Sequence, residues 1–124
     1  MSNPKVDQYG SKIWYNEKGQ YHRTDGPAVE RADGSTEWYF HNQPHRFGGP
    51  AVETPDGYRA WYRYGELHRS DGPAVEYANG NKFWFFNGKL HRSDGPAIEC
   101  VNGHKEWWTK VEKQFKYNWI KEGF

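Results

Sequence analysis

The chain of 124 residues is long enough for one compact domain and too short for two, so we expect a single domain over residues 1–124. Aromatic residues make up 19% of the sequence, whereas leucine occurs only at Leu67 and Leu90, which excludes a leucine-rich helical bundle and argues against disorder. The formal net charge of +1 excludes a general electrostatic attraction to nucleic acid or to an anionic membrane.

The first residues of the chain contain part of a sequence pattern that recurs further along it. Residues 10–14 match residues 34–38 in the spacing from glycine to tryptophan. The turn that follows, at residues 16–19, is one residue longer than the equivalent turn of the later units. We therefore predict a half-repeat with a bulged turn at this end of the chain.

From there the chain repeats itself with a period of 23 residues. A fixed period is the signature of a repeat array, in which each unit stacks on its neighbours. We therefore predict β-hairpin repeats over residues 8–106. Three series carry the period without slippage: His22-Arg23, His45-Arg46, His68-Arg69 and His91-Arg92; Trp38, Trp61, Trp84 and Trp107; Gly26-Pro27-Ala28, Gly49-Pro50-Ala51, Gly72-Pro73-Ala74 and Gly95-Pro96-Ala97.

Two Asn-Gly pairs define the hairpins of the best-kept unit. Asn79-Gly80 and Asn87-Gly88 lie between β-prone residues, and Asn-Gly accepts the positive φ angles of a type I′ turn. We predict two-residue turns at both pairs, with one strand over residues 82–86 between them. The resulting register places two neighbours beside each ring: Val75 and His91 beside Trp84, and Ala74 and Leu90 beside Phe85.

The segment His-Arg-x-Asp-Gly-Pro-Ala joins one unit to the next. Proline removes a hydrogen-bond donor from a β-ladder and glycine permits a bend, so we expect the sheet to kink at each joint. A unit of 23 residues cannot bury a core by itself, and its neighbours must shield its rings. The predicted fold class is mainly β, with antiparallel β-hairpins in an elongated, curved sheet.

The C-terminal segment follows a different pattern. Trp108, Val111, Phe115 and Trp119 fall at helical spacing, and neither proline nor glycine interrupts residues 104–122. We predict an α-helix over residues 107–121 that caps the open end of the array. The lysines on its remaining faces leave contact with a membrane surface as an alternative role.

The repeat resembles the MORN-type repeat, whose units are β-hairpins stacked into a curved sheet. The likeness rests on Trp84-Phe85-Phe86-Asn87-Gly88, on the following Lys89-Leu90-His91 and on Gly95, and it covers about residues 9–106. The Arg after the His and the Asp-Gly-Pro-Ala element depart from that family's pattern and look like variant repeats of small proteins from tailed bacteriophages and large DNA viruses. The resemblance implies a scaffold or contact surface, sometimes for phospholipids, and for a short viral protein it implies a host partner.

The four His-Arg pairs are the obvious chemical candidates. Consecutive strand residues point to opposite faces, so we expect each histidine to pack on the tryptophan layer and to donate to a backbone carbonyl or a nearby aspartate. Recurrence in every unit favours packing, because a catalytic site is needed once. Equivalent histidines lie too far apart for one metal ion, and Phe47-Gly48 replaces Ser-Asp in the second unit. We expect no enzymatic activity, no metal and no cofactor.

The second unit is where the repeat becomes most cationic on the tryptophan face. We expect Arg59, Arg63 and His68 to surround Trp61, and with Trp84 and His91 of the next unit they are our candidate binding residues. Aromatic side chains and arginine anchor protein interfaces. They also hold phosphates and stack on bases.

These observations favour a non-enzymatic binding protein. The leading hypothesis is a phage-encoded accessory protein that inhibits a host defence protein by occluding its surface. One alternative is a sponge that sequesters a small phosphorylated nucleotide. Others are phospholipid contact and a self-assembling scaffold, a homo-oligomer formed through the open sheet edge. The single cysteine, Cys100, and the lack of a long apolar segment lead us to expect a cytoplasmic protein without a membrane span.

Overall fold

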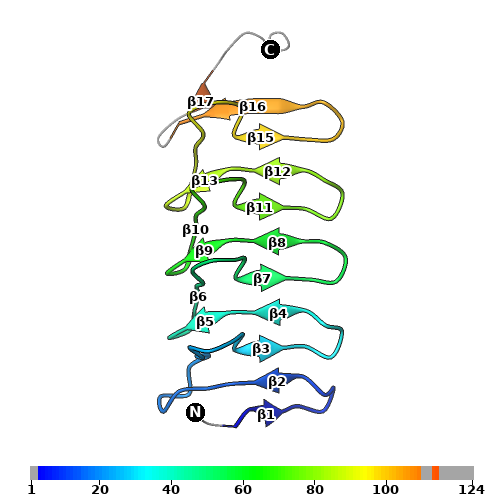
Figure 1. The fold of residues 1–124 in the computed structure, drawn as a ribbon, viewed down its shortest axis with the longest axis vertical. Coiled ribbons are helices and arrows are strands. Elements are labelled where there is room, and N and C mark those ends of the chain that lie inside the picture. The colour runs from blue at the N-terminus through cyan, green and yellow to red at the C-terminus, as the bar shows by residue number, and fades with distance from the viewer. Residues whose placement is uncertain (1–2, 110–112, 115–124) are drawn as a thin grey trace.

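The computed structural model describes residues 3–109 and 113–114, which form a ladder of short antiparallel strands (Figure 1). One column of the ladder is an open sheet of eleven strands, and the other consists of three separate two-stranded hairpins. The prediction of a mainly β, elongated array of antiparallel hairpins is therefore confirmed, while its curvature stays a prediction.

Most strands span only two residues. In spatial order, the eleven-stranded sheet consists of β1 (Lys5–Val6), β2 (Lys12–Ile13), β3 (Val29–Glu30), β4 (Thr36–Glu37), β7 (Val52–Glu53), β8 (Arg59–Ala60), β11 (Val75–Glu76), β12 (Lys82–Phe83), β15 (Ile98–Glu99), β16 (Lys105–Trp108) and β17 (Lys113–Gln114). The three hairpins are β5 (Tyr39–Phe40) with β6 (Gln43–Pro44), β9 (Tyr62–Arg63) with β10 (Glu66–Leu67), and β13 (Phe85–Phe86) with β14 (Lys89–Leu90).

A tryptophan links the two columns within each complete unit. The backbone N–H of Trp61 donates to the carbonyl of Ala74 at 2.7 Å, on the side of the sheet. Its carbonyl accepts from the N–H of His68 at 3.0 Å, on the side of the hairpin. Each hairpin is joined in turn to the preceding unit by backbone bonds, such as those from Gly65 N–H to the carbonyl of Pro44 and from Arg46 N–H to the carbonyl of Tyr62. Each unit thus depends on its neighbours for backbone pairing as well as for burial.

The core is thin and consists of small side chains beneath the rings. Ala74 has no exposed surface, and neither do its equivalents one repeat away, Ala51 and Ala97. Val29 is the largest side chain that is fully buried. Because alanine lets backbones and rings approach closely, the alanine of each Gly-Pro-Ala triplet belongs to this core.

One of the two predicted turn types is correct. Asn87 and Gly88 both have positive φ, at 51° and 80°, and Phe85 pairs with Leu90 as predicted for a two-residue turn. At the other turn only Gly80 has positive φ, and Asn79 instead accepts a side-chain bond from the N–H of Asn81.

This second turn is longer than predicted and shifts the register by one residue. Val75 pairs with Phe83 rather than with Trp84, so the predicted neighbour of that tryptophan is wrong on the sheet side. His91 does lie opposite Trp84, as its N–H donates to the Trp84 carbonyl at 3.0 Å. The Asn side chain decides the outcome, because its bond to the backbone two residues on stabilises the longer turn.

The predicted C-terminal helix is not supported. Trp107 and Trp108 belong to strand β16, where they pair with Gln114 and Lys113 of β17. The rest of the predicted span, residues 110–112 and 115–121, lies outside the described residues. Residues 107–108 are held in an extended strand by this pairing and by the pairing of residues 105–106 with β15. Within the described part of the chain, no helix has the length and apolarity needed to cross a membrane.

Candidate functional site

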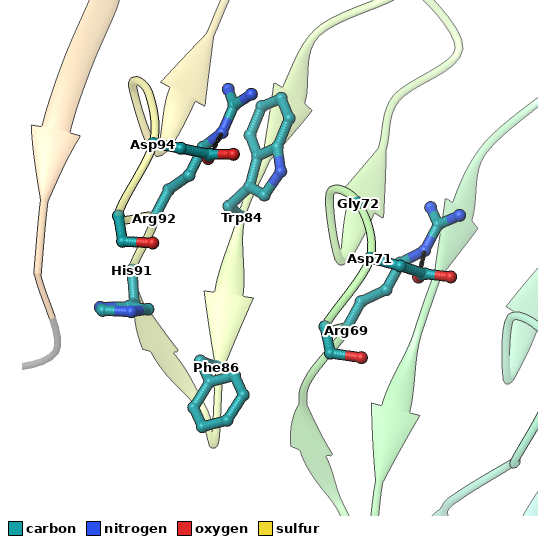
Figure 2. Close-up of a pocket in the computed structure, with 10 residues that line it drawn as sticks. Arg69, Asp71, Gly72, Trp84, Phe86, His91, Arg92 and Asp94 are labelled. Carbon is teal, nitrogen blue, oxygen red and sulfur yellow. Dashed lines mark hydrogen bonds and ion pairs between the residues drawn. The ribbon is translucent and has the colours of Figure 1, made fainter.

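The conserved geometry of the repeat is built around the arginine of each connector, the segment that begins with His-Arg. In the fourth connector, residues 91–97, Cζ of Arg92 lies 3.9 Å from the centre of the Trp84 ring (Figure 2). Its Nε donates to Asp94 at 3.0 Å, and its Nη1 donates to the carbonyl of Pro96 at 3.1 Å and to Glu99 at 2.9 Å. We call this arrangement of ring, carboxylates and carbonyl around one guanidinium the arginine clip.

The clip explains the Gly-Pro-Ala triplet as well as the aspartate. A Cβ placed on Gly95 would lie 2.8 Å from Cζ of Arg92, so the guanidinium lies between the tryptophan ring and this glycine. The same contacts recur around Arg23 and Arg69, whose Nε atoms lie 2.9 and 3.0 Å from Asp25 and Asp71. In the complete clips the arginine donors are bonded to groups of the same chain. The clip therefore stabilises the fold and is not a site for a ligand.

The histidines have a different role from the predicted one. They pack on phenylalanine or tyrosine rings rather than on tryptophan, with ring centres 4.4 Å apart for His68 and Phe86 and 4.0 Å apart for His45 and Tyr64. Nδ1 of His68 accepts a bond at 3.0 Å from the N–H of Asn87, in the turn of the same hairpin column. His22 and His45 accept from the residue 19 positions on in the same way. Arginine, not histidine, therefore occupies the tryptophan layer, which corrects our prediction.

Burial lowers the pKa of His45 and His68, and the positive charge of Arg63 lowers both pKa values further. The ordinary pKa of a histidine side chain is 6.5. Below this pH the unfolded chain binds protons that the folded histidines do not, so the free energy of unfolding decreases as the pH falls through this range. Protonation of Nδ1 would also remove the acceptor of the Asn87 N–H.

We expect the melting temperature to be lower at about pH 5 than at about pH 7.5, as followed by circular dichroism. In the variant His68→Asn, whose side chain offers an acceptor without titrating, this difference should be smaller. An equal difference in both proteins would contradict the assignment of His68 as a contributor.

The second connector, residues 45–51, breaks the clip. Cζ of Arg46 lies 4.0 Å from the centre of the Trp38 ring, and its Nη1 donates to the carbonyl of Pro50 at 3.1 Å, as in the other units. However, Gly48 stands where the other connectors have aspartate, and its φ of 85° is one that none of those aspartates adopts. Glu53, seven residues after Arg46, lies 3.4 Å from Arg59 instead. Among the described residues Arg46 makes no ion pair, in contrast to the other three connector arginines.

The same connector exposes a cluster of rings. Phe47 is 60% exposed and Tyr64 is 53% exposed. The Tyr64 ring stacks on His45 with centres 4.0 Å apart, and Cζ of Arg63 lies 4.7 Å from the centre of the Phe47 ring. We call His45, Arg46, Phe47, Arg63 and Tyr64 the aromatic–arginine patch.

Tyr64 occupies an unfavourable backbone conformation in this patch. Its φ is 48°, in the left-handed region, and the equivalent residue of the next hairpin is Asn87, a type that tolerates this region well. An aromatic residue retained at such a position costs of order 1 kcal/mol, and strain of this kind is concentrated at functional sites. This position is therefore a second departure from the structural requirements of the repeat.

Grooves lie between successive connectors. One of about 370 Å³ separates the second and third connectors and is lined by Trp61, Arg63 and His68 together with Arg46 and Arg69. The next, of about 510 Å³, is lined by Trp84, Phe86 and His91 between two complete clips (Figure 2). The first groove has Asp71 as its one lining carboxylate, whereas the second has both Asp71 and Asp94, so the positive charge is concentrated at the second connector.

Five of the six predicted binding residues line these grooves. Trp61, Arg63 and His68 lie together as predicted, and Trp84 and His91 line the neighbouring groove. Arg59 does not join them, because it lies in the sheet between Glu53 and Glu76, at 3.4 and 3.5 Å.

Sequence reasoning missed Arg46, Phe47 and Tyr64 as site residues. The available signals were the Phe47-Gly48 interruption of the motif and a tyrosine where the other turns have histidine or asparagine. In the described part of the chain, no group of three or more His, Cys, Asp or Glu side chains is placed to hold a metal ion.

Comparison with known proteins adds no relative, since no family model, curated protein or solved structure matches this chain. The site therefore rests on the geometry of the second connector alone.

Proposed function

We propose that this chain is a non-enzymatic binding module, a variant of the MORN-type repeat, that holds a partner protein on the aromatic–arginine patch. The observation that carries the proposal is the contrast between connectors. Arg23, Arg69 and Arg92 are engaged by carboxylates of their own units, whereas Arg46 is not. The same connector exposes Phe47, and the adjoining hairpin exposes Tyr64.

The composition of the patch fits an anchor for a protein. Tyrosine and arginine are enriched among the residues that dominate binding energy, and exposed rings gathered in one place mark an interaction site, whereas single exposed rings are common on any surface. The rings are held in place before binding, Tyr64 by His45 and Phe47 by Arg63, which lowers the entropy lost on association. The Arg46 guanidinium, which forms no ion pair with a described residue, favours an acidic surface on the partner.

Within this proposal the partner is a host protein, and the chain inhibits it by covering its surface. Support for the host and for a phage origin comes from the resemblance to viral repeat proteins. Support for occlusion comes from the extended array, which continues on both sides of the patch and would cover more of the partner than the patch itself (Figure 1). A host defence component is the partner class that this origin favours.

The substitution Tyr64→Asn tests the proposal. It gives this turn the Asn-Gly sequence of residues 87–88, so the folded protein should be at least as stable as the parent. The parent chain should capture a protein from bacterial lysate at near-integer stoichiometry. The amount of this protein captured by the variant, measured by quantitative mass spectrometry, should be lower by about tenfold or more.

The matched control is Tyr9→Asn, the same change at a tyrosine that is 73% exposed in a turn of the other column. Capture by this variant should equal that of the parent. Equal capture by the Tyr64 variant would overturn the proposal, because the patch would then contribute nothing to binding.

The groove between the second and third connectors favours one alternative, sequestration of a small phosphorylated nucleotide. Arg46 and Arg63 could neutralise phosphate there, and Trp61 offers a ring for stacking. Under this alternative, native mass spectrometry of the purified protein shows a bound nucleotide at fixed stoichiometry, and no protein is captured.

A further inference from the structure

The three complete clips show what the second one lacks. In each of them a carboxylate oxygen lies 2.9 to 3.0 Å from Nε of the arginine, supplied by the aspartate two residues further on. These aspartate side chains are largely exposed, so each carboxylate approaches the guanidinium from the solvent side. The position beside Nε is therefore accessible from outside the fold.

In the second connector this position is open while the arginine remains fixed. Trp38 and the Pro50 carbonyl hold Arg46 as their counterparts hold the other arginines. Gly48 offers no side chain, and a Cβ built on it would meet no atom within 4 Å. The groove of about 370 Å³ adjoins both residues. A guanidinium with a preset orientation, whose Nε–H bonds to none of the residues that the structure describes, is a recognition element for an oxyanion.

We infer that the Nε–H of Arg46 binds the carboxylate of an aspartate or glutamate side chain from the partner protein, in the place that Asp25, Asp71 and Asp94 occupy in their own units. This inference rests on the proposed function. Carboxylate is favoured over phosphate because the fold itself places a carboxylate at this position in three other units, at normal hydrogen-bond distance. The partner thus completes the clip that the second connector leaves incomplete.

The surroundings define the sequence that would fit. Trp61 lines the groove that adjoins the open position, and Phe47, the residue after Arg46 in the chain, is more than half exposed. These rings favour apolar neighbours beside the acidic residue. Arg63 adds a second cation over the Phe47 ring. The class of ligand is therefore an acidic residue within an apolar segment, presented by a folded surface or by a peptide.

Nuclear magnetic resonance of the arginine Nε–H groups tests this directly on the full chain. The probe is the peptide acetyl-Leu-Asp-Leu-amide, and its control is acetyl-Leu-Asn-Leu-amide, which has the same shape without the charge. We expect a saturable shift of the Arg46 Nε–H signal with the first peptide and a response about tenfold weaker with the second. The signals of Arg69 and Arg92 should not move, because their own aspartates occupy Nε.

Two variants separate the open position from the rest of the patch. Gly48→Asp combined with Phe47→Ser gives the second connector the sequence of the third and fourth, His-Arg-Ser-Asp-Gly-Pro-Ala, which folds at both places. In this variant the response of Arg46 should be lost. Phe47→Ser alone leaves the position open and should retain the response with weaker affinity.

Several results would overturn the inference. They are an Arg46 signal that does not respond, an equal response to both peptides, and a response that survives in the double variant. A response to inorganic phosphate without one to the aspartate peptide would also overturn it, and would favour the nucleotide alternative. Loss of partner capture in Tyr64→Asn without any Arg46 response would leave the proposed function in place and remove only the carboxylate. Retained capture in Tyr64→Asn would overturn the proposed function itself.

Discussion

Replacing Gly72 by alanine is expected to lower the free energy of unfolding by about 1–3 kcal/mol. The added Cβ would lie 2.9 Å from Cζ of Arg69, so the guanidinium would have to leave its place against the Trp61 ring. With it would go the bonds from the guanidinium to Asp71, to the Pro73 carbonyl and to Glu76. Urea denaturation followed by tryptophan fluorescence measures the loss.

A double-mutant cycle with Arg69→Ala distinguishes the clip from a simple backbone effect. Gly72 does not have positive φ, so alanine is acceptable to the backbone there. Once Arg69 is removed, Gly72→Ala should be neutral or slightly stabilising, since it lowers the entropy of the unfolded chain. Additive effects of the two changes would show that the glycine is required for a reason unrelated to the arginine.

Ala74→Leu is expected to have a larger effect, about 3 kcal/mol or failure to fold. Ala74 has no exposed surface, and its backbone is fixed on both sides by bonds to Trp61 and Phe83 at 2.7 and 2.8 Å. The additional side-chain atoms can be accommodated only by separating neighbouring units, and loss of contact between units propagates along a repeat array.

The control for this prediction is Ala78→Leu, the same change at an exposed position in the far turn of the same unit. Its thermal melt should lie close to that of the parent, because no packed atom has to move. If Ala74→Leu melted like this control, the thin core would not be the packed layer that the structure indicates.

Much of the fold can be predicted from the 23-residue period, because a turn or strand preference that is weak in one unit recurs in every unit. The Asn87-Gly88 turn follows directly from the preference of both residues for positive φ. The Asn79-Gly80 turn did not follow, since the asparagine side chain has a second option, a bond to its own backbone two residues on. Propensity alone does not rank these two options, and a difference of one residue moves each side chain to the other face.

The contact between each connector arginine and a tryptophan could not be predicted from the alternation of side chains along a strand. The prediction assumed one continuous strand through Trp84, whereas β12 ends before this residue and β13 begins after it. Alternation does not hold across that break, and the connector carries Arg92 onto the ring while His91 turns to the phenylalanine layer. The function of the regular motif therefore became clear only from tertiary contacts.

The candidate site was predicted in part for a similar reason. Trp61, Arg63 and His68 were recognised from their charge and aromatic character. The sequence shows that Gly48 replaces the aspartate of the other connectors, but only the structure shows that Glu53 lies beside Arg59 and not beside Arg46. In a repeat protein the binding residues are those that depart from the pattern, and a departure gains meaning when the role of the pattern is known.

Hydrogen–deuterium exchange mass spectrometry of the chain, alone and with its captured partner, tests most directly whether the second connector is where this protein binds. The account predicts slower exchange on binding in residues 45–48 and 63–65, with little change in the turns of the opposite column, such as residues 78–80. Protection confined to those opposite turns, or spread equally over all four connectors, would contradict it.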